Sequence, residues 1–479
     1  MVWLPRLLLM LAVSLACSGA PALAWQEELV SRRAASDAQR DASPEAPVVN
    51  EADIAQTTLR RWARFDPENF RARLLHEREP ARSKALEDLH GVFADHPDVP
   101  ELLIEAVQHA IDTGSVGDST VAMVRLLASV ERAQVRAALL RWLELQEVDK
   151  PATALSVAIL AGLREFEDAA SAQAAMRLLE ASDFRLVMLS ADILGQFPSP
   201  ETTVALVALA ERPEFMQSHG FRASALQAIS RQDSSEAVDF LVRSLPRLDG
   251  QLKLAVVDHL TRISGQPIGG NALGWAKWWS ANRASYNYPA SQHPTPQRYA
   301  WDYPVPSFYA HGVYAKRVVF VVDISSTMRE LVSPLETRLD RAKKELVRAI
   351  GGLPPDAAFN IVAFDREVQP WNPFSVPAVP ENKQKAARAV LVMQNGRGTN
   401  IFDSLVAAIG SDPKLEAIYL LSDGLPTAGR VSDKSEIVRI ITEENLFRRI
   451  SIHTIAVGRN SQLLQRLAEL NAGGYRTSQ

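Results

Sequence analysis

The stretch Lys316–Met328, KRVVFVVDISSTM, decides the fold of the carboxyl-terminal part of the chain. Its run Val318–Val322 is apolar and mostly β-branched, which is typical of a strand buried on both faces of a parallel sheet. Asp323, Ser325 and Thr327 stand at the carboxyl end of this strand, where open α/β sheets bind their ligands. Taken alone, these three residues fit a turn with a helix cap equally well.

Two later segments repeat this placement of polar residues beside a regular element. The glycine-rich loop GRGTN contains Thr399 and leads into a helix predicted over residues 401–409. The segment LLSDGLPT puts Asp423 directly after an apolar strand predicted over residues 417–421. Because carboxylate and hydroxyl oxygens are ligands of hard divalent cations, the three segments together favour a Mg²⁺ site over three unrelated turns.

The ordered motifs DxSxT, GxGTN and SDGxPT resemble those of the von Willebrand factor A (vWA) domain with its metal-ion-dependent adhesion site. By this resemblance the metal ligands are Asp323, Ser325, Thr327, Thr399 and Asp423, some of them through water. The family more often has serine where Thr327 stands, but threonine keeps the hydroxyl group. Mg²⁺ is the expected ion, with Mn²⁺ and Ca²⁺ as the alternatives.

The composition of the 479-residue chain is that of an ordinary globular protein with roughly two to four domains. It has 52 Lys and Arg against 56 Asp and Glu, a formal net charge of −4. This balance gives no sign of nucleic-acid binding, which favours a basic patch or stripe.

The first residues are predicted to be a secretory signal peptide. Arg6 supplies the positive charge, residues 7–16 the apolar core, and residues 22–24 a small-residue cleavage site. No later apolar run approaches the roughly 20 residues of a membrane span. The protein is therefore expected to be periplasmic, bound to the cell envelope or secreted. Lipid anchoring at Cys17, the only cysteine, is the rival interpretation, but the residues before it fit a lipobox poorly.

Between the predicted tether and the connector, Leu, Ala, Val and Ile recur at helical spacing. Leu160, Leu194, Ile229 and Ile263 end similar helical segments at separations of about 34 to 35 residues, a period that indicates stacked helix pairs. We expect an α-solenoid that resembles HEAT repeats, with armadillo-like or irregular repeats as alternatives. The aromatic stripe Trp275, Trp278 and Trp279 is expected to cap it, with binding of a ligand or partner as the alternative role. The predicted organisation is a signal peptide (1–24), a flexible tether (25–57), HEAT-like helical repeats (58–285), a Pro/Tyr-rich extended connector (286–313) that packs along one or both domains, and a vWA-like domain (314–479).

Strands and helices alternate through the last domain, which predicts an α/β, doubly wound and mostly parallel sheet. Helices are expected over 339–350, 381–393, 401–409, 435–447 and 461–470, and strands over 318–322, 359–364, 417–421 and 451–457. Edge strands are expected over 368–371 and in the terminal GGYRTS. Such a sheet gathers the loops at Asp323, Thr399 and Asp423 along one edge.

The resemblance favours a protein without enzymatic activity that binds a partner through its metal ion. An Asp or Glu carboxylate of a protein partner is the expected ligand, and the helical repeats would form a second interaction surface. Two alternatives remain. A metal-dependent phosphatase would use Asp323 as nucleophile, but Ser325 stands where its general acid belongs. In an envelope scaffold, the metal would only stabilise the domain.

Other polar residues carry weaker signals. His76 and His90 are expected on the surface, and His293, His311 and His453 are interpreted as isolated. Two further residues, Asp365 and Asp403, are expected in a turn and on a solvated helix face.

Overall fold

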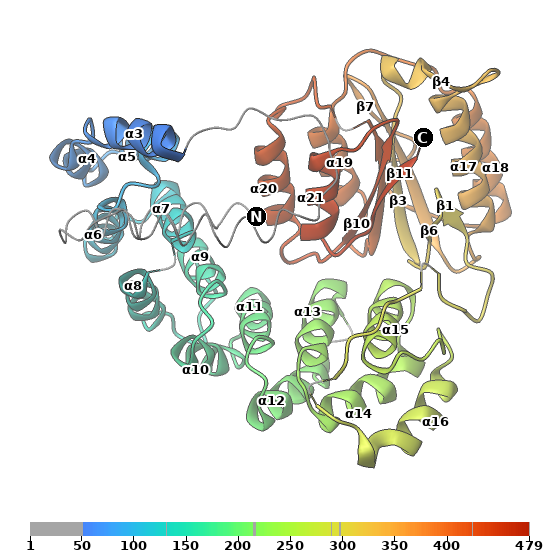
Figure 1. Ribbon diagram of the computed structural model, residues 1–479, viewed down its shortest axis with the longest axis horizontal. Helices are drawn as coiled ribbons and strands as arrows, with labels where there is room; N and C mark the ends of the chain where they lie inside the picture. Colours follow the sequence, from blue (N-terminus) through green and yellow to red (C-terminus); the bar gives the residue numbers. More distant parts are fainter. Residues whose placement is uncertain are drawn as a thin grey trace. The chain divides into compact units, whose positions relative to one another are not determined.

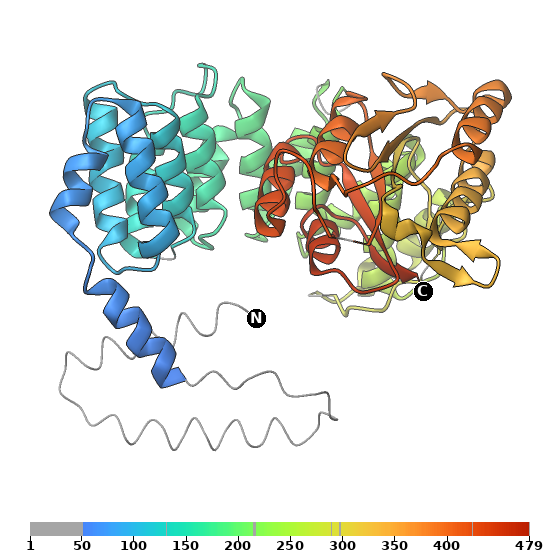
Figure 2. The same ribbon diagram turned by 90° about the horizontal axis from the view of Figure 1, so that it is seen from above.

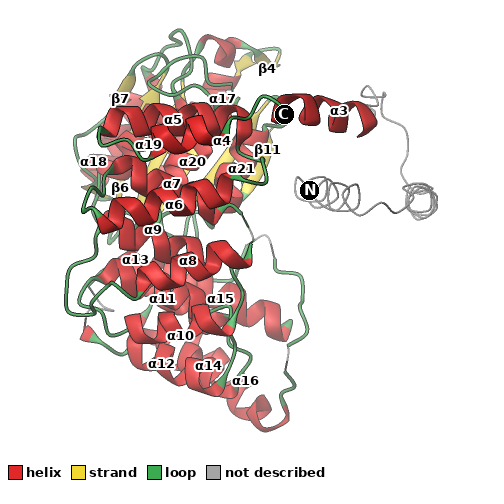
Figure 3. Cartoon of the chain, turned by 90° about the vertical axis from the view of Figure 1, so that its left-hand side faces the viewer, coloured by secondary structure: helices red, strands yellow, loops and turns green. Residues whose placement is uncertain are grey.

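The computed structural model describes residues 51–478 except 131, 214–216, 289, 297 and 424, with side chains from residue 56 onward (Figure 1). The predicted signal peptide, Cys17 and residues 25–50 of the predicted tether lie outside these residues. The chain divides into two compact units after Val130, inside the predicted repeat region. Every described element before Ser307 is helical (Figure 3).

The described part of the first unit consists of helices. They are α3 (Glu51–Trp62), α4 (Pro67–Leu74), α5 (Glu79–Phe93), α6 (Val99–Asp112) and α7 (Asp118–Ala128). Helix α3 begins inside the stretch expected to be a tether, because a polar, alanine-rich sequence has good helix propensity even without a strong apolar pattern. His76 and His90 are exposed, as predicted.

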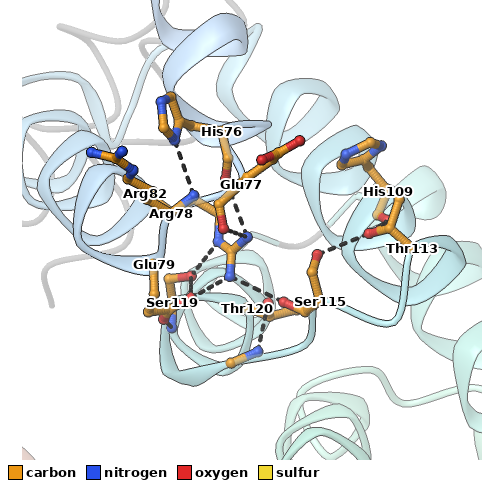
Figure 4. A network of polar contacts seen from close by, with 11 residues as sticks. His76, Glu77, Arg78, Glu79, Arg82, His109, Thr113, Ser115, Ser119 and Thr120 are labelled. Atoms are coloured by element: carbon orange, nitrogen blue, oxygen red, sulfur yellow. Dashed lines mark hydrogen bonds and ion pairs between the residues drawn. The ribbon is translucent and has the colours of Figure 1, made fainter.

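A buried arginine joins α5 to α7 and to the loop before α7 (Figure 4). Arg82 of α5 is 6% exposed and pairs with Glu79. Its guanidinium also donates to Ser119 Oγ at 3.1 Å and to the Ser115 carbonyl at 3.0 Å. Glu79 in turn accepts from the Ser119 backbone N–H at 2.5 Å, at the first turn of α7. The charge is thus fully hydrogen-bonded, as a buried arginine requires.

The second unit begins with a further series of helices. They are α8 (Ala133–Leu143), α9 (Ala154–Leu163), α10 (Ala169–Leu178), α11 (Phe184–Leu194), α12 (Pro200–Ala210), α13 (His219–Ser230), α14 (Ser235–Ser244), η3 (Leu245–Arg247), α15 (Gly250–Ser264), α16 (Ala272–Asn282) and η4 (Arg283–Ser285). Most of the helices α8 to α14 pack against the helix two further along the chain, as α9 does against α11 and α11 against α13. The residues that gave the repeat period, Leu160, Leu194, Ile229 and Ile263, lie on alternate helices α9, α11, α13 and α15 and are buried. The HEAT assignment itself stays a prediction.

The helix starts are fixed by capping side chains. Asp168 accepts from the backbone N–H groups of Ala170 and Ser171 at the start of α10. Ser199 forms a capping box with Thr202 at the start of α12. Such caps satisfy donors that an isolated helix end leaves free.

Helix α16 carries the predicted tryptophan stripe and packs against α14. Trp275 and Trp279 are buried, and the Trp279 indole donates to Asp239 Oδ1 at 2.7 Å. The stripe thus packs into the helical rows, in agreement with the capping interpretation.

The predicted connector is held against both neighbouring parts. Its His293 backbone N–H donates to the Arg262 carbonyl of α15 at 2.7 Å, and the Tyr299 hydroxyl donates to Asp258 Oδ1 at 2.6 Å. It ends in the short hairpin of β1 (Ser307–Phe308) and β2 (His311–Gly312), where Phe308 is fully buried against the sheet. The prediction that the aromatic residues of this segment pack is confirmed.

The last part of the chain is a sheet with the strand order β11-β10-β9-β3-β6-β7, and β8 also pairs with β6. Its parallel strands are β3 (Arg317–Asp323), β6 (Ala358–Phe364), β9 (Ala417–Ser422), β10 (Ser451–Val457) and β11 (Tyr475–Ser478). The antiparallel edge strands are β7 (Val368–Pro370) and β8 (Val376–Pro377). The predicted doubly wound, mostly parallel sheet is confirmed.

Helices cover both faces of the sheet, and the two groups lie on opposite sides in both ribbon views (Figures 1 and 2). One face packs against α17 (Arg338–Gly352) and α18 (Pro380–Leu391), the other against α19 (Ile401–Gly410), α20 (Lys434–Glu444) and α21 (Gln462–Leu470). Successive side chains of β3 point to opposite faces of the sheet. Phe320 therefore lies in the core with α17 and α18, and Val319 and Val321 lie in the core with α19, α20 and α21. A 3₁₀ turn η5 (Ser326–Arg329) and the hairpin β4 (Leu331–Ser333) and β5 (Glu336–Thr337) lie between β3 and α17.

The two edges of the sheet have different neighbours. At the amino ends of the strands, Glu416 accepts from the Gln251 N–H of α15 at 3.0 Å, and Arg449 pairs with Asp192 of α11. The repeat helices therefore cover the amino edge of the sheet. The loops with the predicted metal ligands follow the carboxyl ends of the strands.

Candidate functional site

Asp323 is the last residue of β3, in the middle of the sheet, and its side chain is fully buried. Asp323 Oδ1 accepts from the Ser325 backbone N–H at 2.8 Å, and Oδ2 accepts from Ser422 Oγ at 2.7 Å. Ser422 ends the neighbouring strand β9. The orientation of the carboxylate is therefore fixed from its own loop and from the next strand.

Ser325 and Thr327 lie in the turn that follows. Their hydroxyl oxygens are 2.9 Å apart, with Ser325 buried and Thr327 half-buried. The Asn395 side-chain amide donates to the Ser325 carbonyl at 2.9 Å, and the Gly396 backbone N–H donates to the Ile324 carbonyl at 2.7 Å. These two bonds hold the glycine-rich loop against the first motif.

Thr399 lies at the end of the glycine-rich loop, just before α19. Its backbone N–H donates to Thr427 Oγ1 at 3.0 Å, and the Thr427 N–H donates back to the Thr399 carbonyl at 3.0 Å. Gly398 has φ +77°, a backbone conformation that side chains with a Cβ rarely adopt. The second and third motifs are thus joined directly through Thr399 and Thr427.

Asp423 follows β9 and is 3% exposed. Its Oδ1 accepts from the Leu425 N–H at 3.3 Å. The pKa of Asp323 is raised to about 6, mainly by burial and also by the nearby charge of Asp423, against the hydrogen bonds that stabilise the carboxylate. Two buried carboxylates therefore lie close enough to repel one another, a situation that a bound cation relieves.

The available donors fit a hard cation. Within the described part of the chain, no Lys or Arg forms an ion pair with Asp323 or Asp423. No three His, Cys, Asp or Glu side chains gather there as a metal cage. The oxygens at this edge come instead from the two carboxylates and from the hydroxyls of Ser325, Thr327 and Thr399, a set suited to Mg²⁺ with water filling the remaining positions.

Two neighbouring aspartates have structural roles. Asp365 lies in the turn after β6, as predicted, where its side chain accepts from the backbone N–H groups of Glu367 at 2.8 Å and Arg397 at 3.2 Å. The expectation that Asp403 is merely solvated was wrong. Asp403 pairs with Arg430 at 2.5 Å and accepts from the Asn400 amide at 3.0 Å, which ties the start of α19 to the loop after β9.

The sequence interpretation missed Ser422 and Thr427, which position Asp323 and Thr399. Both lie inside the quoted motif LLSDGLPT, so a hydroxyl directly before a strand-end aspartate was the available signal. The interpretation of His311 and His453 as isolated was also wrong, because their ring centroids lie 5.3 Å apart at the amino edge of the sheet.

Comparison with known proteins agrees with this fold. Residues 316–477 match the family model of the von Willebrand factor type A domain. The inter-alpha-trypsin inhibitor heavy chain H4 of Homo sapiens is 29% identical over 171 residues, which cover 33% of this chain and 18% of that protein. Heavy chain H1 of Mesocricetus auratus is 31% identical over 136 residues, which cover 26% of this chain and 14% of that protein. The chain thus spans less than a fifth of either relative.

A solved structure, the von Willebrand factor type A protein from Catenulispora acidiphila, is similar with 17% identity and a TM-score of 0.30. The similarity covers 35% of this chain and 40% of that chain. Within the described residues, no helix has both the length and the apolar character needed to cross a membrane.

Proposed function

We propose that the von Willebrand factor type A domain at residues 316–477 binds a divalent cation, Mg²⁺ before Mn²⁺ or Ca²⁺, and captures a carboxylate of a protein partner. The side chains that would hold the ion are those of Asp323, Ser325, Thr327, Thr399 and Asp423. A cation held by them would supply an open coordination position for an Asp or Glu oxygen. The protein would act outside the cytoplasm, by adhesion or as a scaffold, without enzymatic activity.

The observation that carries this proposal is the pair of buried carboxylates, Asp323 and Asp423, for which the described residues provide no basic partner. Leaving two such charges uncompensated in a buried site is costly. Hydrogen bonds from Ser422, Asn395 and Thr427 hold the three motif loops in place around them. A preorganised set of oxygens of this kind favours an ion over water alone.

The motif at Asp323 favours binding over phosphoryl transfer. A nucleophilic carboxylate of this kind needs a positioned general acid beside it. Ser325 at the second motif position cannot supply that acid.

The repeat helices offer a second surface for the same partner or another one. A hollow of about 640 Å³ is lined by residues at the start of α8, between α9 and α10 and after α11, among them Arg136, Arg164, Glu165, Glu167 and Asp168. Its charged lining suits a polar protein surface, because interface rims are rich in such side chains.

The direct test is calorimetric titration of Mg²⁺ into metal-free protein. Wild type is expected to bind with one site, and Asp423→Asn is expected to bind at least about a hundredfold more weakly, since even outer-shell substitutions cost about 10- to 100-fold. Asp356→Asn is the matched control, because Asp356 is an exposed carboxylate before β6 that pairs with Lys316. Equal Mg²⁺ affinity in all three proteins would refute the metal site.

Partner capture then separates adhesion from a scaffold role. Immobilised wild type is incubated with envelope extract in Mg²⁺ and in EDTA, beside Asp423→Asn in Mg²⁺. Adhesion predicts a partner that is lost in EDTA and in the variant. Metal-insensitive capture together with a melting temperature raised by Mg²⁺ would instead favour the scaffold.

A further inference from the structure

A second cavity lies at the opposite edge of the sheet, with lining residues from α13, α15 and the amino ends of the strands. Its volume is about 1030 Å³. The lining comes from α13, α15, the connector, β2, the loop before β10 and the segment from α21 to β11. The volume is comparable to that of pockets that hold small organic molecules.

Several buried nitrogen atoms of residues that line this cavity have no hydrogen-bond partner among the described residues. They are His311 Nε2, His453 Nε2, Arg449 Nε and Arg476 Nε. His311 and His453 are only 7% and 9% exposed. Because a buried polar atom without a partner costs free energy, an acceptor that reached the donors among these atoms would be stabilised.

The neighbour of His453 defines what its free nitrogen offers. The Gly474 backbone N–H donates to His453 Nδ1 at 3.0 Å, so the proton of the neutral imidazole sits on Nε2 and makes it a donor. Burial lowers the pKa of His453 to about 4 and is the main cause that lowers the pKa of His311 to about 3. Both rings are therefore neutral at neutral pH, and the positive charge beside them comes from Arg476.

The charges around the cavity leave this arginine without a counter-ion among the described residues. Two acidic residues in the lining are already engaged: Asp258 with Arg262 and Tyr299, and Glu469 with side chains on the exposed face of α21. Five arginines line the same cavity: Arg164, Arg231, Arg262, Arg449 and Arg476. Arg449 and Arg164 both pair with Asp192, whereas no described acidic side chain pairs with Arg476.

We infer that this cavity binds a small organic molecule that carries an oxyanion, held by the Arg476 guanidinium and the His453 Nε2–H group. Charge-assisted hydrogen bonds from arginine to a carboxylate or phosphate are among the strongest available to proteins. Aromatic side chains of Tyr299, Tyr314 and Tyr475 also line the cavity and provide apolar area for the body of the ligand. This site is separate from the proposed metal site and does not depend on it.

The test is calorimetric titration of wild type with benzoate, phenyl phosphate and benzyl alcohol. EDTA is present throughout, so that no bound cation can attract the anions. The two anions distinguish a carboxylate from a phosphate site, and benzyl alcohol offers the same ring without the charge. At least one anion is expected to bind in saturable fashion, and benzyl alcohol at least about tenfold more weakly.

Arg476→Gln is expected to weaken binding of the preferred anion at least about tenfold. The matched control Arg459→Gln removes an exposed arginine after β10 that does not line the cavity, and it is expected to bind as wild type does. Failure of both anions to bind, or equal binding by Arg476→Gln and wild type, would show that the cavity holds only water.

A measurement on wild type alone guards against a variant that does not fold. Crystals soaked with 4-iodobenzoate are expected to show the anomalous signal of iodine inside the cavity, with the carboxylate near Arg476 Nε. An iodine signal found only elsewhere would overturn the assignment.

Discussion

The carboxyl and amino edges of the sheet present opposite chemistry. At the carboxyl edge, Asp323 and Asp423 are buried acceptors, and no described Lys or Arg pairs with them. At the amino edge, His453 and Arg476 carry buried donors that have no acceptor within the described part of the chain. The first edge suits a cation and the second an anion.

The difference follows from what covers each edge. The carboxyl edge is made by loops that directly follow strands, so the chain itself brings the motifs together. The amino edge is covered by α11, α13 and α15, whose contacts include the hydrogen bond to Glu416, the pair of Arg449 with Asp192 and an edge-to-face contact of Phe184 with Phe447. Three variants probe this contrast.

The largest effect is expected at the covered edge, from Arg449→Met. This change leaves Asp192, 7% exposed, with only the more distant Arg164 and a hydrogen bond from Ser224. Removal of one member of a buried ion pair typically costs about 3–5 kcal/mol of the free energy of unfolding. Urea denaturation measures it.

The matched control is Arg466→Met, which removes an exposed arginine that pairs with Glu469. Exposed pairs contribute roughly 0–1 kcal/mol, so this variant is expected to unfold almost as wild type does. If Arg449→Met were no less stable than Arg466→Met, the polar contacts at the amino edge would not hold the sheet to the helices.

A somewhat smaller effect is expected from the titration of Glu416. Burial raises its pKa from 4.5 to about 7, against the backbone hydrogen bonds from Gln251 and Lys316. The folded protein therefore binds this proton more tightly than the unfolded chain does. Its contribution to stability is full below about pH 4.5, falls as the pH rises and levels off above about pH 7.

Glu416→Gln removes this titration and keeps an oxygen that can accept both backbone hydrogen bonds. The stability of wild type minus that of the variant is expected to fall by up to about 3 kcal/mol between these two pH values. Urea denaturation at several pH values measures both proteins, and the subtraction cancels the opposing titration of the buried histidines. A difference that is constant with pH would contradict the expectation.

The smallest effect is expected at the carboxyl edge, from Ser422→Ala. Loss of the 2.7 Å hydrogen bond to Asp323 Oδ2 leaves the carboxylate less firmly oriented. Mg²⁺ affinity is expected to fall about tenfold, the lower end for residues that orient a ligand. Ser404→Ala in α19 is the control, since its buried hydroxyl donates to the Ile401 carbonyl of its own helix. Calorimetric titration distinguishes the two variants.

These edges also differ in how far the sequence predicts them. The strand-end motifs and the alternation of strands with helices are local signals, and they predicted the parallel sheet, with helix and strand bounds mostly within a few residues. They also placed Asp323 and Asp423 at one edge, because parallel strands bring their carboxyl ends together. Ser422 and Thr427 were missed although they belong to the same motif.

The amino edge gave no such signal. His311 and His453 lie on strands far apart in the sequence, and only the packed sheet brings their rings together. The pair of Asp192 with Arg449 is likewise long-range, and so is the pair of Asp403 with Arg430 at the carboxyl edge. Periodicity reports which face of an element is buried but not which distant element covers it, so these contacts could not be predicted from one sequence.

The close contact between α13 and the loop before β10 can be disturbed by a single substitution. Gly220, in the first turn of α13, lies so near the loop before β10 that an added Cβ would come within 2.0 Å of the Phe447 carbonyl oxygen. A methyl group at that position would force α13 and the loop apart by steric repulsion without altering any charge. The Mg²⁺ affinity of Gly220→Ala would therefore show whether the site at the carboxyl edge depends on the contact between α13 and this loop.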